Sequence, residues 1–231
     1  MAELRGKLTE VFQLGCERAG ILNLPAKFWP QPGQYLPCQN LSREAAILPT
    51  NLFNVMGSKG RLSLGPLPEA WIPGDMLAVL PPHGHGFHLP ANARRVGLLA
   101  MGASPAHLLT LVEPALAQDA AITLFYFPTQ PIEILDWLPP AVEVSPVASL
   151  LENLDWPDYL AMEVNLEDLD ELSALFEGSR LPFPGQVLVR TAMPCRGLGK
   201  CGVCSVKTTR GWKLACQDGP VFPLEELIHV A

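Results

Sequence analysis

The chain has 231 residues, a formal net charge of −7 at pH 7 and a hydrophobic content of 48%. A chain of this length can bury a substantial core and is long enough for about two domains. Its acidic balance argues against a nucleic-acid-binding protein or a polybasic membrane-surface protein, and its hydrophobic content argues against intrinsic disorder.

The sequence predicts a cytoplasmic protein without a membrane segment. Its first 20 residues lack the continuous apolar stretch of a signal peptide, and the most apolar region, 96–112, is interrupted by Ser104, Pro105 and His107. Six cysteines are too few for a disulfide scaffold in a chain of this size, and four of them fall within residues 195–216. In a reducing compartment, such crowding favours a metal site.

Residues 1–90 are expected to form an antiparallel β-barrel or sandwich. Short apolar runs alternate with turn signals, as in PGQYLPCQN and LFNVMGSKGRLSLGPL. Glycine and proline at such regular intervals indicate short strands joined by tight turns.

Residues 91–178 are expected to form an α/β unit with a parallel sheet. A buried strand at 95–101, an apolar helix around 106–116 and a second strand at 121–127 make a β-α-β unit, and the same alternation continues afterwards. Residues 178–186 contain two prolines and two glycines and are interpreted as a linker to a small C-terminal domain, 179–231.

The C-terminal region carries four closely spaced cysteines. Five residues separate Cys195 from Cys201, two separate Cys201 from Cys204, and eleven separate Cys204 from Cys216. The segment before the last cysteine is typical of a β-hairpin with its turn at 210–211, which would bring Cys216 back beside Cys204. These four thiols are the candidate metal ligands.

The spacing resembles the three-cysteine loop of [2Fe–2S] ferredoxins, with the fourth cysteine unusually near. Gly197, Gly199 and Gly202 can turn backbone N–H groups toward the negatively charged cluster and are expected to support it. Structural zinc is an alternative, but zinc usually takes two close ligand pairs and only Cys201 and Cys204 form one. Unmetallated cysteines are the third possibility.

The tail also resembles a known family. MPCRGLGKCGVC at 193–204, followed by WKLACQDGPVF at 212–222, is similar to the cluster domain of the electron-transfer subunit of bacterial dihydroorotate dehydrogenase. Pro32–Tyr35, Gly74–Asp75 and Pro82–Phe87 resemble turns of the flavin-binding barrel in the same family. The resemblance implies a ferredoxin-reductase-like fold, with an N-terminal antiparallel β-barrel, a central parallel-sheet α/β domain and a small C-terminal [2Fe–2S] domain.

The chain departs from the family at both nucleotide sites. Residues 48–52 read LPTNL where the family has an arginine and a serine for the flavin, and 101–104 read MGAS where it has a glycine-rich turn. A Cys-Gly-Pro motif has no counterpart near 161–165. The missing residues argue against FAD without excluding it, and NAD(P) is not expected.

Several other polar residues are given structural interpretations. We expect exposed polarity for the histidines and no catalytic pair from Ser104 and His107, because neither group has an orienting partner nearby in sequence. The acidic residues around 163–171 are expected to form the solvated face of a helix. Trp212 could shield a cluster from water, or simply pack on the hairpin. The histidines are His83, His85 and His88, and the acidic residues are Glu163, Glu167, Asp168, Asp170 and Glu171.

The sequence as a whole favours an electron-transfer subunit of an oxidoreductase over a stand-alone enzyme, and no catalytic residue is assigned. Its partner is expected to be a flavin-containing dehydrogenase subunit in a hetero-oligomer, with dihydroorotate oxidation in pyrimidine biosynthesis as the best single guess from the resemblance. The alternatives are a zinc-stabilised non-redox interaction module and a complete FAD/NAD(P)H reductase with divergent motifs.

Overall fold

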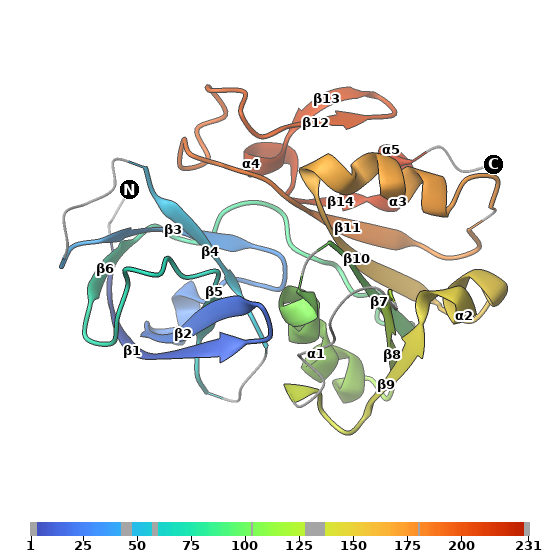
Figure 1. Cartoon of the computed structure of the whole chain (residues 1–231), viewed down its shortest axis with the longest axis horizontal. Coiled ribbons are helices and arrows are strands. Elements are labelled where there is room, and N and C mark those ends of the chain that lie inside the picture. The colour runs from blue at the N-terminus through green and yellow to red at the C-terminus, as the bar shows by residue number, and fades with distance from the viewer. Residues whose placement is uncertain are drawn as a thin grey trace.

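The computed structural model describes residues 4–42, 48–56, 60–102, 104–127, 137–179 and 181–228. A six-stranded antiparallel barrel is followed by a six-stranded, mostly parallel sheet, and a short hairpin lies on the β14 side of that sheet (Figure 1). None of the described helices is both long and apolar enough to cross a membrane.

The barrel closes in the order β1-β2-β5-β4-β3-β6. Its strands are β1 (Leu4–Leu14), β2 (Glu17–Asn23), β3 (Tyr35–Asn40), β4 (Thr50–Asn54), β5 (Ser63–Gly65) and β6 (Met76–Val79), with the 3₁₀ turn η1 (Ala26–Phe28) after β2. Strand β1 alternates as expected, with Leu8 buried in the barrel between exposed Lys7 and Thr9. The predicted antiparallel barrel is confirmed.

The second sheet has the order β14-β11-β10-β7-β8-β9. Its strands are β7 (Arg95–Met101), β8 (Ala121–Tyr126), β9 (Val142–Pro146), β10 (Tyr159–Asn165), β11 (Gly185–Arg190) and β14 (Val221–Pro223). The first five run parallel, and only β14 is antiparallel to its neighbour β11. The predicted parallel sheet is confirmed. It also contains two strands, β11 and β14, that lie outside the segment 91–178.

Short helical segments connect the strands of this sheet. They are η2 (Pro105–Leu111), α1 (Val112–Ala117), α2 (Val147–Glu152), η4 (Leu166–Asp168) and α3 (Leu169–Leu175). The expected single helix around 106–116 is instead a 3₁₀ segment followed by a six-residue α-helix. In Figure 1, η2 and α1 lie between the barrel and the sheet, and η2 contacts both β4 and β10.

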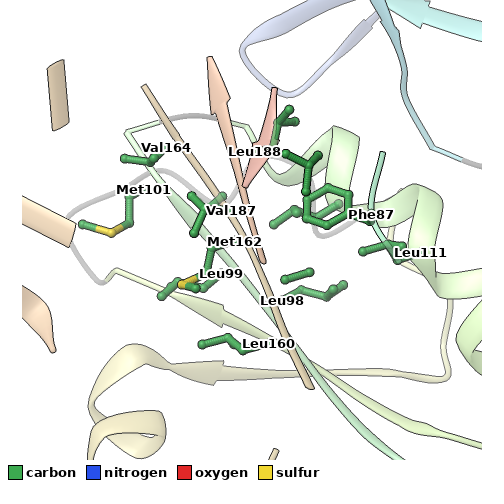
Figure 2. Packing of buried hydrophobic residues seen from close by; sticks show 14 of the residues in the cluster. Phe87, Leu98, Leu99, Met101, Leu111, Leu160, Met162, Val164, Val187 and Leu188 are labelled. Atoms are coloured by element: carbon green, nitrogen blue, oxygen red, sulfur yellow. The ribbon is translucent and has the colours of Figure 1, made fainter. Parts of the chain in front are cut away.

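The sheet is held by a continuous hydrophobic core. Leu99, Leu160 and Val187 come from three adjacent strands and are fully buried, and Figure 2 shows them on one face of the sheet with Met162, with Leu98 on the opposite face toward Phe87. Each fully buried side chain of this size contributes about 1.5–3 kcal/mol by its removal from water. These strands are apolar on both faces because helices or the barrel cover both sides.

The C-terminal region is built onto this sheet. It contains β11 and β14, the hairpin of β12 (Ser205–Thr208) and β13 (Gly211–Leu214), and the short helices α4 (Ala215–Asp218) and α5 (Leu224–Leu227). The segment interpreted as a linker, 178–186, already enters β11 at Gly185. The cysteine loop therefore leaves directly from a central strand and returns to the sheet through β14.

Candidate iron–sulfur site

The cysteine loop follows the end of β11 at Arg190 and folds on left-handed backbone conformations. Gly197 and Gly199 have φ values of 76° and 65°. A Cβ atom at Gly197 would lie 2.6 Å from Cδ2 of His83, and one at Gly199 would lie 2.4 Å from Cδ of Gln217. The glycines are therefore required both by the backbone and by the close approach of neighbouring side chains.

The hairpin brings the fourth cysteine back to the loop. Ser205 pairs with Leu214 and Thr208 with Gly211, so the turn falls where the sequence predicts it. At the base of the hairpin, the backbone N–H of Ala215 donates to the carbonyl oxygen of Cys204 at 2.9 Å. The expected proximity of Cys216 and Cys204 is confirmed.

The four thiols differ in exposure and interact mainly in two pairs. Cys201 is exposed and Cys195 is half-buried, whereas Cys204 and Cys216 are only 1% and 3% exposed. The Cys195 thiol interacts with Cys201, and the Cys216 thiol interacts most strongly with Cys204 and also with Cys195. The site thus has an outer pair near the surface and an inner pair in the core.

The protein environment favours the thiolate form at one end of the site. Burial opposes ionisation of Cys195, but hydrogen bonds from the backbone N–H of Gly199, the Cys201 thiol and the backbone N–H of Lys200 outweigh it. Together they lower the pKa of Cys195 from 9.0 to about 7. Burial and the neighbouring Cys204 raise the pKa of Cys216 to about 12. The N–H groups that stabilise one thiolate are the kind of donor that an anionic cluster needs.

The barrel forms a wall against this loop. Asn51 of β4 donates through Nδ2 to the carbonyl oxygen of Met193 at 3.0 Å, and the N–H of His85 donates to the carbonyl oxygen of Gly219 at 2.6 Å. The hydroxyl of buried Tyr35 lies 3.5 Å from the carbonyl oxygen of Cys216. Burial, followed by the charge of the nearby cysteines, raises the pKa of Tyr35, so this hydroxyl stays protonated as a donor.

The outer face of the site is basic and apolar. Residues 190–217 contain six Lys or Arg and no Asp or Glu, although the whole chain has a net charge of −7. Arg190 pairs with Glu17 and Glu163, and Lys213 pairs with Glu226, so the exposed basic residues of this face are Arg196, Lys200, Lys207 and Arg210. Leu198, Val203 and Trp212 are 58%, 52% and 73% exposed around these charges. Trp212, considered as a possible water shield, is thus itself mostly in contact with solvent.

Two of the histidines lie against the cysteine region, where exposed polarity alone was expected. His83 places Nδ1 2.6 Å from the carbonyl oxygen of Pro81 and packs beside Tyr35, with its ring against Gly197. Nδ1 of His85 lies 3.2 Å from the carbonyl oxygen of Asp218. The contacts of His83 with Gly197 and of His85 with Asp218 arise only because residues far apart in sequence pack together, so no local pattern could show them.

One expectation about the acidic residues is wrong. Glu163 lies inside β10 and is completely buried, with Oε1 2.8 Å from Nδ1 of His107. The sequence did contain a signal, because Glu163 interrupts the apolar strand YLAMEVN, where a carboxylate requires a buried partner. Ser104 does not pair with His107; its Oγ accepts a hydrogen bond from the N–H of Ala106 at 3.3 Å.

Comparison with known families supports an iron–sulfur site. Residues 191–228, which include all four clustered cysteines, match the iron–sulfur cluster-binding domain of dihydroorotate dehydrogenase B. The electron-transfer subunit of dihydroorotate dehydrogenase B (NAD(+)) from Caldanaerobacter subterraneus subsp. tengcongensis is 28% identical over 228 residues, covering 86% of this chain and 87% of that protein. Sulfhydrogenase 1 subunit gamma from Pyrococcus furiosus is 26% identical over 191 residues. That match covers 68% of this chain and 64% of the subunit, less than two thirds of its length.

Solved structures show the same architecture. The structure of the NADH-dependent reduced ferredoxin–NADP oxidoreductase, studied for flavin-based electron bifurcation, has a TM-score of 0.73 and 18% identity, covering 96% of this chain and 88% of that one. The ferredoxin reductase of carbazole 1,9a-dioxygenase has a TM-score of 0.60 and 15% identity, covering 78% and 67% of the two chains. The fold is therefore ferredoxin-reductase-like, as the sequence predicts.

Proposed function

We propose that the chain is a distant member of the dihydroorotate dehydrogenase B electron-transfer subunit family and that it carries single electrons through a [2Fe–2S] cluster. The proposed ligands are Cys195, Cys201, Cys204 and Cys216. The observation that carries the proposal is the convergence of these four thiols from a loop and a hairpin onto one site lined by backbone N–H donors.

The residues present fit a two-iron cluster. Such a cluster accepts and releases one electron at a time and takes four thiolates, two on each iron. The outer pair, Cys195 and Cys201, would hold one iron, and the buried inner pair, Cys204 and Cys216, would hold the other. The two interacting pairs would give each iron its two thiolates, whereas a single zinc would need all four thiolates around one ion.

The protein would set the direction and reach of electron transfer. The inner pair is sealed by the barrel wall and the sheet, whereas the outer pair lies beside exposed Leu198 and Val203. Electrons would therefore enter or leave most easily through the outer face, where a partner can approach.

The partner is proposed to be a flavin-containing oxidoreductase subunit with an acidic docking face. The basic charges of residues 190–217 would attract such a face, and the exposed apolar side chains would form the dry centre of the contact. Dihydroorotate oxidation in pyrimidine biosynthesis is the best single assignment, because two relatives are electron-transfer subunits of that dehydrogenase. The sulfhydrogenase relative makes a hydrogenase-type complex the competing assignment.

Anaerobic purification followed by iron, sulfide, zinc and flavin analysis tests the proposal. We expect about two irons and two sulfides per chain, with broad visible absorbance that bleaches with dithionite and an S = 1/2 EPR signal in the reduced state. A colourless protein with one zinc per chain would instead support the non-redox interaction module. Flavin released by heat denaturation, together with NADH oxidation, would support the complete reductase.

A further inference from the structure

The strand order of the parallel sheet reverses between β7 and β10, and ligands usually bind at such a switch point in folds of this kind. From β7 the chain proceeds to β8 and β9 on one side, and then returns to β10 and β11 on the other. In open α/β sheets, ligands bind outside the carboxyl ends of the two strands at which the order reverses. Here these strands are β7 and β10. Strand β7 is followed by Gly102, and strand β10 ends at Asn165.

A carboxylate of the chain itself occupies the approach to β7. Nδ2 of Asn165 donates to the carbonyl oxygen of Gly102 at 3.1 Å and to Oδ2 of Asp168 at 2.9 Å. A Cβ atom at Gly102 would lie only 2.5 Å from Oδ2 of Asp168. A phosphate approaching this backbone would meet negative charge at contact distance.

The segment after β7 also lacks the donors that hold a phosphate. It is the seven-residue 3₁₀ segment η2, which begins with Pro105 and therefore has no N–H at its first position. The next N–H, that of Ala106, already donates to Oγ of Ser104. Ala103 lies outside the described residues. The described residues at this switch point therefore do not fit the pyrophosphate of a nicotinamide dinucleotide.

Four charged or titratable side chains from four different elements meet where the barrel packs against the sheet. They are Glu17 of β2, His107 of η2, Glu163 of β10 and Arg190 of β11, here called the seam cluster. His107 is 0% exposed, with Nδ1 2.8 Å from Oε1 of Glu163 and Nε2 3.7 Å from Oε1 of Glu17. Arg190 lies 3.2 Å from Oε1 of Glu17 and 3.4 Å from Oε1 of Glu163.

The seam cluster reaches charge balance when the imidazole carries a second proton. The charged groups facing His107 are the carboxylates of Glu17 and Glu163 and the guanidinium of Arg190, and the ring of Phe53 packs against it at 5.3 Å. Two carboxylates and one guanidinium leave one uncompensated negative charge in a buried site, which is costly. Burial lowers the pKa of His107, but the two carboxylates outweigh burial and Arg190, and the net pKa is raised.

We infer that the seam cluster holds a buried proton on His107 that ties the barrel to the sheet, and that Asp168 with the donor-poor turn after β7 excludes nicotinamide dinucleotides from the switch point. Glu17 belongs to the barrel, and Glu163 belongs to the sheet, so the imidazolium joins the two parts through charge. The inference does not depend on the identity of the metal at the cysteine site.

The seam cluster also supports the base of the cysteine loop. Arg190 is the last residue of β11, and the loop to Cys195 begins immediately after it. Its guanidinium is fixed by two buried carboxylates, so the start of the loop is fixed as well.

Titration of His107 by long-range ¹H–¹⁵N NMR of the histidine side chains is the direct test. We expect an imidazolium pattern that persists well above pH 6.5, the ordinary histidine pKa. A pKa at or below 6.5 overturns the inference. Because the folded pKa is raised, the stabilisation is complete below pH 6.5 and is lost as the pH rises through the folded pKa.

Thermal unfolding of matched variants gives the second readout. The wild-type Tm is expected to fall from pH 6 to high pH by about 3–5 °C for each unit by which the His107 pKa is raised. His107→Gln should lose this dependence, and exposed His88→Gln should keep it. Equal pH dependence in wild type and His107→Gln would overturn the inference.

Glu17→Gln keeps the test decisive if His107→Gln does not fold. With one carboxylate neutralised, Glu163 and Arg190 balance without a proton, so burial dominates and the His107 pKa should fall below 6.5. The protein should then lose stability at low pH instead of high pH. An unchanged pH dependence in Glu17→Gln would count against the buried proton.

Direct titration with NADH and NADPH tests whether nicotinamide dinucleotides are excluded from the switch point. Isothermal calorimetry of the purified holoprotein should show no saturable binding up to ~1 mM, the upper end of usual KM values. Saturable binding of either nucleotide below that concentration overturns the inference that the dinucleotide is excluded.

Discussion

The cysteine site and the seam cluster are both polar centres in an apolar fold, but they are assembled in opposite ways. All four cysteines lie within residues 195–216, and one loop with one hairpin brings them together. The four side chains of the seam cluster span residues 17–190 and come from four elements. Local assembly produces a half-exposed site suited to exchange with a partner. Long-range assembly produces a mostly buried one, in which only Arg190 keeps 23% of its side chain exposed, and this suits it to holding charge in place.

The largest effect is expected from removing an inner cysteine. Cys204→Ser should abolish stable cluster binding, because one iron loses a ligand in a buried position where water cannot replace it. Iron content and visible absorbance measure the loss, with exposed Cys16→Ser as the control that should retain both. Full iron content in Cys204→Ser would remove this residue from the ligand set.

How much the sequence could reveal follows the same contrast. The barrel, the parallel sheet and the hairpin were predictable because each depends on local periodicity or on a turn at known residues. Strand β14 was not, because three residues, Val221–Pro223, pair with β11 only after the cysteine loop has closed. The burial of Glu163 was missed because its partner His107 lies 56 residues away in sequence.

The second largest effect should come from breaking the seam cluster at its guanidinium. Arg190→Met leaves two buried carboxylates facing one imidazolium, and removing one partner of a buried charge pair costs about 3–5 kcal/mol. Urea unfolding at pH 7 measures the change in free energy of unfolding. Exposed Lys207→Met is the control, with an expected change within about 0.5 kcal/mol.

A loss below about 1 kcal/mol in Arg190→Met would show that water serves the two carboxylates and that the seam is not sealed. Arg190→Met should also raise the rate of iron loss, because the base of the cysteine loop loses its anchor. That second effect joins the two polar centres and would be absent if they were independent.

A smaller effect is expected where the barrel wall meets the cysteine region. Gly84 has a φ of 77°, and a Cβ atom there would lie 2.5 Å from Cδ of Pro220 and 2.7 Å from the carbonyl oxygen of Gly219. Gly84→Ala should cost about 1–3 kcal/mol through this overpacking, beyond the backbone strain. Gly60 has a φ of 78° with open space around it, so Gly60→Ala measures the strain alone. Equal destabilisation of the two variants would mean that the wall yields and does not define the site.

The smallest effect on stability, and the one most specific to function, concerns the basic outer face. Lys207 and Arg210 are exposed on the hairpin and oppose no carboxylate within residues 190–217. Replacing both by Glu should leave iron content and stability unchanged but slow association with an acidic partner, most strongly at low ionic strength. Stopped-flow reduction or oxidation of the cluster by the co-purified partner measures the rate, and Lys7→Glu on the outside of β1 serves as the control. A salt-independent rate that is equal in both variants would place docking elsewhere. A slower rate in the hairpin variant alone would show that the cysteine site, and not the buried seam cluster, is the exchange surface.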